Sequence, residues 1–153
     1  MKKPMLSAEQ AIHTMLQQVQ AKAGTEFVTL AQALDRVLCQ AVYSAIDVPG
    51  YDNAAMDGYA LRAAEVKPDT PLTITGAALA GHAFTQAVPV GACVRITTGA
   101  VLPSDLDTVV MQELVNHVDV EGQPAIACQL IPEPGEHVRK AGEDIGKGQL
   151  VFN

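Results

Sequence analysis

The 153-residue sequence has no tryptophan, only three phenylalanines and three tyrosines, and few basic side chains. Ten lysines and arginines stand against seventeen acidic residues, which gives a formal net charge of −7. This charge repels phosphate backbones, and no basic cluster with interleaved aromatics offsets it, so the composition does not favour nucleic-acid binding. Because aromatics are scarce, we expect a core built from Ala, Val, Ile, Leu and Met.

Cysteine and long apolar runs are also in short supply. Cys39, Cys93 and Cys128 are odd in number, far apart and without a Cys-x-x-Cys pair. We therefore expect buried thiols in a reducing compartment and neither a disulfide framework nor a zinc site. No run approaches the roughly 18 apolar residues of a membrane span, and none follows the N-terminal lysines as in a signal peptide. These absences predict a cytoplasmic protein without a membrane or nucleic-acid partner.

What is present indicates a globular chain of one domain or two small lobes, with 48% hydrophobic and 18% charged residues. Ser7-Ala-Glu-Gln10 and Thr29-Leu-Ala-Gln32 each have the pattern of a capping box. Apolar residues recur behind both boxes at helical spacing. The spacing predicts two short amphipathic helices, one over residues 8–22 with Gly24 after it and one over 29–38.

The middle of the chain has the alternation and turn residues of β structure, with no useful helical period between residues 70 and 130. Glu121-Gly-Gln-Pro124 predicts a hairpin. We expect a small antiparallel, barrel-like lobe, then a loop and a short strand at 149–152. The abrupt end after this strand leads us to expect a longer protein. The predicted strands cover residues 41–46, 72–75, 93–97, 108–111, 115–120 and 125–130.

The stretch Asp47–Ala60 combines three turn dipeptides with apolar residues, which favours a turning segment packed against a core. Such a segment can hold the Asp52 and Asp57 carboxylates rigidly at the edge of a fold, where a pair can bind a hydrated cation or orient water. The alternative is a packed connection with ordinary turn chemistry. Gly146-Lys-Gly148 lacks the rest of a P-loop, and the four histidines show no metal-ligand spacing.

Two further places resist a purely structural interpretation. Arg95–Pro103 ends a strand in two hydroxyls and a glycine, which leaves hydroxyls and amides free for an anion or makes a simple turn. Arg139–Asp144 alternates cations and carboxylates around a glycine, a pattern also typical of a solvated loop.

Together, Asp47–Ala60, Arg95–Ala100 with Asp107–Glu113, and Val138–Gly148 resemble, in order, the signatures of the molybdopterin molybdenumtransferases. This is the MoeA family, whose animal relative is the E domain of gephyrin. The resemblance runs from about residue 5 to 152. Pro103–Asp107 departs from it, because the family commonly has Gly-Ala before the Asp, and this affects the geometry of that turn.

The resemblance implies an enzyme of molybdenum-cofactor biosynthesis that inserts molybdate into adenylylated molybdopterin and releases AMP with the help of a divalent cation, Mg²⁺ by expectation. It implies a homodimer of four-domain subunits and, as a further partner, the adenylyltransferase of the same pathway. The expected fold class is α+β and β-rich. Residues 1–46 plus 131–153 would form an α-rich linker lobe and 47–130 an inserted irregular β lobe, with the catalytic α/β domain and C-terminal barrel absent.

The resemblance also implies the site residues. Asp57, Thr98 and Asp144 match positions that line the family's cleft facing the partner subunit's third domain, so we predict them as catalytic. Asp57 and Asp144 would serve the cation or orient the attacking water, and Thr98 would donate to an oxyanion. Arg95 and Lys140 would offset the negative field near the substrates.

Two other functions stay open from the sequence alone. One is a stand-alone dimerisation or interaction module without catalysis, whereas a transferase would be active only at full length, because the isolated 153-residue chain lacks the principal binding domain. The other is a hydrolase that uses Asp52 and Asp57 as an acid pair.

Overall fold

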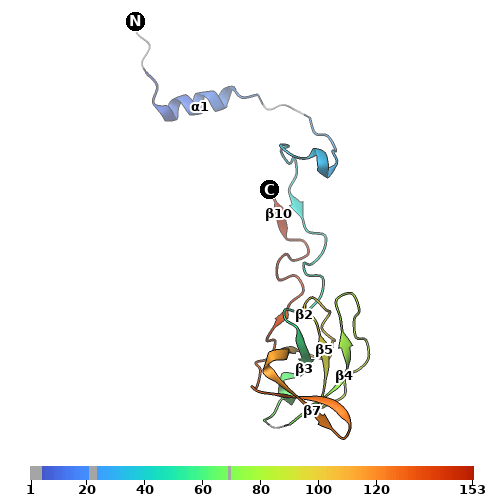
Figure 1. Cartoon of the computed structure of the whole chain (residues 1–153). Helices are drawn as coiled ribbons and strands as arrows, with labels where there is room; N and C mark the ends of the chain where they lie inside the picture. The colour runs from blue at the N-terminus through green and yellow to red at the C-terminus, as the bar shows by residue number, and fades with distance from the viewer. Residues whose placement is uncertain (1–4, 21–23, 69) are drawn as a thin grey trace. The chain divides into compact units, whose positions relative to one another are not determined.

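The computed structural model describes residues 5–20, 24–68 and 70–153. The chain divides into two compact units, Met1–Gln40 and Ala41–Asn153. Residues in strands far outnumber residues in helices, so the predicted α+β, β-rich class is confirmed (Figure 1). Over the described ranges, no helix has the length and apolar character needed to cross a membrane.

The first unit contains the helix α1 (Ala8–Gln18). The predicted capping box is confirmed, because the Ser7 hydroxyl accepts from the Gln10 amide at 3.2 Å and the Gln10 side chain accepts from the Ser7 amide at 3.1 Å. The helix ends at Gln18, earlier than predicted, with Val19 as its C-cap. Residues 21–22 of the predicted helix lie outside the described residues.

The predicted second helix is wrong. Its capping box forms, but only one 3₁₀ turn follows, η1 (Leu30–Gln32), and Asp35 then adopts a φ of 61°. The apolar residues of the predicted stripe are exposed, Leu30 to 92% and Val37 to 95%. A short helix depends on burying its apolar face, and nothing described in this unit covers these side chains.

The second unit is built on a six-stranded sheet in the order β6-β3-β5-β4-β8-β7, and Figure 1 shows its strands curling around one another. The predicted strands at 108–111 and 115–120 are confirmed. The predicted hairpin is confirmed as well, with Glu121 and Gly122 both at positive φ, as a two-residue hairpin turn requires. The strands are β3 (Gly58–Leu61), β4 (Leu72–Ala78), β5 (Ala92–Ile96), β6 (Thr108–Met111), β7 (Val115–Val120) and β8 (Gln123–Cys128).

One strand pair corrects the expectation of a fully antiparallel lobe. β4 and β5 are parallel, with a register shift between Ile74 and Ala77, whereas the other described pairs of this sheet are antiparallel. Residues 79–91 make the crossover between them without a helix. Alternating polarity predicts that a segment is a strand but carries no information on the direction of its neighbour.

Both faces of this sheet are covered, as the buried side chains of its strands show. On β3, Tyr59 and Leu61 belong to one hydrophobic cluster and Ala60 belongs to the other. On β6, Val109 and Val110 divide in the same way. The core is aliphatic, as expected, with Tyr59 as the buried aromatic exception among the described residues.

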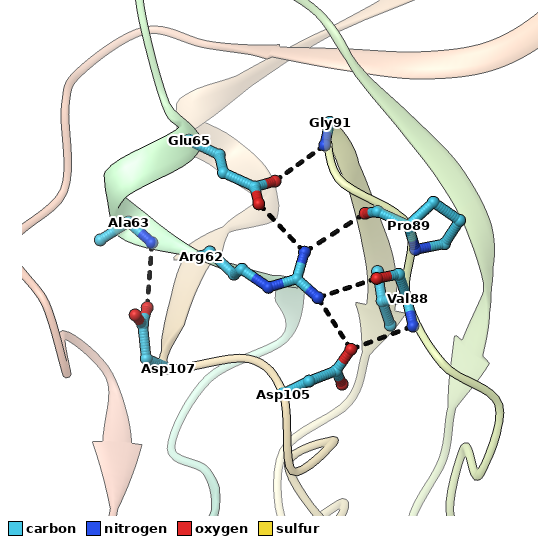
Figure 2. A network of polar contacts seen from close by, with 8 residues as sticks. All are labelled: Arg62, Ala63, Glu65, Val88, Pro89, Gly91, Asp105 and Asp107. Carbon is cyan, nitrogen blue, oxygen red and sulfur yellow. Dashed lines mark hydrogen bonds and ion pairs between the residues drawn. The ribbon is translucent and has the colours of Figure 1, made fainter.

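A polar network around Arg62, directly after β3, fastens three connections to one another (Figure 2). Its guanidinium donates to the Val88 carbonyl at 2.8 Å and to Asp105 at 2.8 Å, and pairs with Glu65 at 3.1 Å. Glu65 also accepts from the Gly91 amide at 2.8 Å. The network thereby fixes the last part of the β4–β5 crossover, at the point where β5 begins.

Two short ribbons join the C-terminal segment to the residues that precede the sheet. β1 (Val42–Tyr43) pairs with β10 (Leu150–Phe152), and β2 (Asn53–Ala54) pairs with β9 (Val138–Arg139). The tail therefore returns to the start of this unit, as the sequence predicted. The predicted domain boundaries, 1–46 plus 131–153 and 47–130, stay a prediction.

Candidate functional site

The residue Asp57 lies in the turn between β2 and β3, and its carboxylate contacts Thr98 at the end of β5. Oδ1 of Asp57 accepts from the Thr98 amide at 2.7 Å and from the Thr98 hydroxyl at 2.7 Å. Both side chains are exposed. Two predicted catalytic residues, 41 positions apart in sequence, are thus in direct contact at the rim of the sheet.

The main chain around Asp57 is held as firmly as its side chain. The Gln112 amide donates to the Asp57 carbonyl at 3.1 Å. Gly58 pairs with Met111, and a Cβ on Gly58 would lie 2.0 Å from the Val110 carbonyl oxygen. Only glycine permits this close approach of β3 to β6, so the sequence Asp57-Gly58 sets where the carboxylate stands.

Hydrogen bonding also sets the charge of Asp57. The Thr98 amide, and after it the Thr98 hydroxyl, lower the pKa of the Asp57 carboxyl, and the charge of Arg95 adds to this. Arg95 is exposed on β5 and lies opposite Tyr59, two residues after Asp57. Asp57 is therefore an ionised acceptor at neutral pH and not a proton donor.

A second polar cluster contains Asp52 and Lys140. Asp52 accepts from Lys140 Nζ at 2.8 Å and from the Ala141 amide at 2.9 Å. The Lys140 hydrogen bond, followed by that of Ala141, lowers the pKa of Asp52. Both carboxylate oxygens of Asp52 accept a hydrogen bond. The ammonium group of Lys140 is paired with Asp52, which weakens the predicted role of Lys140 toward substrates.

Asp144, the third predicted catalytic residue, is paired with Arg139. The guanidinium donates to the two Asp144 oxygens at 2.8 and 2.6 Å and to Glu143 at 2.6 Å. These bonds, with that to Glu143 first, raise the pKa of Arg139, while Arg139 lowers the pKa of Glu143. Sequence reasoning missed this role of Arg139, although the Arg-x-x-x-Glu-Asp spacing is the signal that could have found it.

The three predicted segments meet along β2. Ala54 bonds with the end of β5 on one side, through its amide to the Ala100 carbonyl at 3.1 Å and its carbonyl to the Gly99 amide at 2.8 Å. On the other side Asn53 pairs with Arg139 of β9. Asp57 and Thr98 are joined directly, whereas Asp144 forms no hydrogen bond with either one in the described chain.

The donor set fits a cation only in part. Among the described residues no group of three or more His, Cys, Asp and Glu side chains could hold a metal ion. Asp57 offers one carboxylate oxygen, which suits Mg²⁺ because this ion commonly takes one or two carboxylates and completes its shell with water and substrate phosphate. Both Asp144 oxygens accept from Arg139, so a cation at Asp144 would compete with the guanidinium. The prediction that the two share a cation stays a prediction.

The same geometry bears on the acid-pair hypothesis. Asp52 and Asp57 are held by separate partners, Lys140 and Thr98. Carboxylates that share a proton show one strongly raised pKa, and both of these are lowered. The arrangement therefore does not favour a hydrolase based on this pair.

Comparison with known proteins shows which family this chain belongs to. Residues 6–153 match the model of the MoeA N-terminal region, domains I and II. The chain belongs to the MoeA N-terminal family. The predicted resemblance is thereby confirmed over nearly the whole chain.

Individual relatives agree with this assignment. The molybdopterin molybdenumtransferase of Haemophilus influenzae is 37% identical over 148 residues, covering 97% of this chain and 36% of that protein. The enzyme of the same name from Synechococcus elongatus is 35% identical over 155 residues, covering 97% and 38%. This member of the MoeA family therefore spans little more than a third of the length of these curated relatives.

A solved structure confirms the fold. The crystal structure of the molybdopterin biosynthesis MoeA protein from Pyrococcus horikoshii superposes with a TM-score of 0.78 at 32% identity. The match covers 98% of this chain and 38% of that one. This chain thus shares its fold with that protein.

Proposed function

We propose that this chain contributes the Asp57–Thr98 rim to the active site of a molybdopterin molybdenumtransferase, which inserts molybdate into adenylylated molybdopterin. Membership of the MoeA family supports the reaction, and the names of its relatives supply the substrate class. The observation that carries the proposal is the exposed, ionised Asp57 carboxylate held by Thr98 on a glycine-dependent turn. A rigid charge at an exposed rim is what a binding site needs.

The substrates are anions, so a bare carboxylate beside them needs a mediator. Mg²⁺ bound to one Asp57 oxygen would supply a positive charge between the carboxylate and the substrate. The residues of this chain hold the carboxylate in place and keep it ionised. In this proposal Arg95 adds a positive charge at the same rim and offsets the negative field near the substrates.

The proposal is tested with Asp57→Asn in the full-length protein. We expect molybdate-dependent turnover to fall by roughly a hundredfold, since one preorganised charge contributes on the order of 3 kcal/mol to such a site. The melting temperature should stay unchanged. Glu121→Gln, which removes an exposed carboxylate from the β7–β8 turn, is the matched control. Unchanged turnover in Asp57→Asn would remove Asp57 from the site.

Assembly forms a second part of the proposal. In the described residues of Met1–Gln40 no side chain is buried, and large apolar residues such as Met15, Leu16 and Leu34 are 62%, 66% and 83% exposed. Apolar surface of this extent marks a contact with other protein. We assign it to a homodimer, with the adenylyltransferase of the pathway as a transient partner in the cytoplasm.

The same surface is the observation that favours the other candidate, an interaction module without catalysis. Sedimentation of wild-type and Leu16→Ala/Leu34→Ala full-length protein, with turnover measured on the same samples, separates the two. The transferase proposal expects loss of both dimer and turnover in this variant. Absence of molybdate-dependent turnover in the wild-type protein, combined with loss of assembly in the double variant, would support the module.

A further inference from the structure

The Thr98 hydroxyl has one proton, and the acceptor within hydrogen-bond distance of it is the Asp57 carboxylate. Thr98 Oγ1 lies 2.7 Å from Asp57 Oδ1. An ionised carboxylate has no proton to give, so Thr98 is the donor in this bond. The hydroxyl then has only lone pairs left, and these can accept but cannot donate. A Thr98 that donated to an anionic substrate would first have to release Asp57.

The two bonds from Thr98 fall on the same carboxylate oxygen. Oδ1 accepts both from the amide and from the hydroxyl, whereas Oδ2 has no hydrogen-bond partner among the residues that the structure describes. Two donors on one oxygen fix the rotation of the carboxylate plane. They leave Oδ2, on an exposed side chain, as the oxygen that faces a ligand.

The backbone of Asp57 gives the side chain little freedom to compensate. Gln112 holds its carbonyl, and the Val110 carbonyl blocks any side chain at position 58. The main chain of Asp57 is therefore fixed, but these main-chain contacts do not set the rotation of its carboxylate group. The side chain that contacts this carboxylate is Thr98.

We propose that Thr98 is a positioning residue that orients the Asp57 carboxylate toward the substrate, and not the hydrogen-bond donor to an oxyanion that the sequence predicted. This role deepens the proposed function and rests on it. The Oδ2 atom of Asp57 is the oxygen left to bind the cation of the proposed function. The lowered pKa of Asp57 accords with this arrangement, since both Thr98 bonds favour the charged form.

The test begins on the 153-residue chain itself and needs no turnover. The carboxyl ¹³C resonance of Asp57, assigned by its loss in Asp57→Asn, is titrated in wild type, Thr98→Ser and Thr98→Val. Serine keeps the hydroxyl, and valine keeps the shape and the amide but loses the hydroxyl. We expect the Ser variant to titrate as wild type does and the Val variant to titrate at higher pH. An Asp57 midpoint that is the same in all three proteins overturns the proposal.

Thr98→Ala provides a second loss of the hydroxyl, so the result does not depend on how valine packs at this exposed position. Amide spectra of each variant confirm the fold before titration. The Ala variant should show the same upward shift as the Val variant. A shift in Val alone would point to packing and would count against the proposal.

The full-length enzyme supplies the kinetic arm. In Thr98→Val we expect kcat to fall roughly tenfold, the size of one charge-assisted hydrogen bond, with little change in KM for molybdate and with the acidic limb of the pH profile moved to higher pH. Thr98→Ser should restore kcat. A rise in KM alone, with an unmoved pH profile, would show that Thr98 binds substrate directly.

The two levels of the hypothesis fail separately. If Asp57→Asn retains turnover, the proposed function fails, whatever the titrations show. If Asp57→Asn loses turnover but the Asp57 midpoint ignores the Thr98 hydroxyl, Asp57 belongs to the site and Thr98 does not position it.

Discussion

The units Ala41–Asn153 and Met1–Gln40 differ in where their apolar side chains lie. In the first, Tyr59, Leu61 and Ile96 are at most 1% exposed and belong to clusters on both faces of a sheet. In the described part of the second, no side chain is buried and Leu30 is 92% exposed. The sheet unit therefore contains its own source of stability, whereas the described residues of the N-terminal unit leave their apolar side chains exposed.

The difference also separates two kinds of evidence for function. The residues of the Asp57–Thr98 rim stand on a sheet that holds its own geometry, so their positions can be argued from contacts within this chain. The N-terminal unit supports an argument about assembly only.

Thiol reactivity should show the largest contrast. Cys39 in the N-terminal unit is exposed and Cys93 on β5 is buried, which corrects the sequence-based expectation that all three thiols are buried. Burial raises the pKa of Cys93 to about 12, with the nearby Cys128 adding to the shift. We expect iodoacetamide to modify Cys39 at least about a hundredfold faster than Cys93, because Cys93 reacts only after the sheet opens.

Peptide mass spectrometry after timed alkylation of the native chain measures this ratio, and the same reaction in urea is the control that should abolish it. Comparable rates for the two thiols in the native chain would mean that β5 is not in a stable sheet.

Truncation of an apolar side chain should come next in size. Ile96→Ala removes a fully buried side chain from β5 and should lower the free energy of unfolding by about 3 kcal/mol. Leu34→Ala removes one that is 83% exposed and should change it by less than about 0.5 kcal/mol in the monomeric chain. Urea unfolding followed by far-UV circular dichroism and by tyrosine fluorescence measures both.

Protein concentration is the control for this pair. If Leu34→Ala proves as costly as Ile96→Ala, and its cost grows with concentration, the apolar surface is already covered by self-association in the isolated chain. The contrast between the two units would then hold for the monomer alone.

The ion pairs of the two units supply a third contrast. Arg62 is 23% exposed and holds Glu65, Asp105 and two carbonyls, so Arg62→Met leaves several groups unpaired and should cost about 2 kcal/mol, discounted for partial exposure. Arg36 pairs with Glu26 at a surface where both are more than half exposed, so Arg36→Met should cost no more than about 0.5 kcal/mol. Tyrosine fluorescence reports on Arg62→Met, because all three tyrosines lie in the sheet unit, and far-UV circular dichroism of the helical N-terminal unit reports on Arg36→Met.

High salt sharpens the result. In 1 M NaCl the cost of Arg62→Met should largely persist, because its hydrogen bonds to the carbonyls of Val88 and Pro89 act at short range and salt screens them little. Equal costs for the two arginines would contradict the view that the Arg62 network fastens the crossover.

The contrast also explains which parts of the fold could be predicted from the sequence. Strands such as Thr108–Met111 and the Glu121–Gly122 turn follow from local chemistry and were predicted correctly. The direction of β5 beside β4 depends on a distant pairing that no local pattern encodes. The second helix failed because its capping box is local, whereas the burial that would keep it helical is not.

The candidate site divides in the same way. The resemblance assigns Asp57 and Thr98 to one cleft, and the structure adds that the two are in hydrogen-bond contact. Hydrogen-bond geometry shows two further things that the sequence does not. The Thr98 hydroxyl donates its proton to Asp57, and the Arg139 guanidinium donates to both carboxylate oxygens of Asp144. A sequence names the groups that are present but does not say which of them satisfy one another.

The smallest contrast should be in acid stability, between two lysines of the same loop, Lys140 and Lys147. Folding lowers the pKa of Asp52, chiefly through the Lys140 hydrogen bond, so this carboxylate stabilises the fold above its unfolded pKa of about 3.9. That contribution disappears as pH falls through the lower folded value. Lys140→Met should therefore flatten the loss of stability below about pH 4, by a small amount because both side chains are partly exposed. Lys147→Met is the matched control, since only its main-chain amide contacts Asp47. Urea midpoints between pH 7 and pH 2 measure the slope, and an equal flattening in both variants would assign it to net charge and not to the Asp52–Lys140 pair.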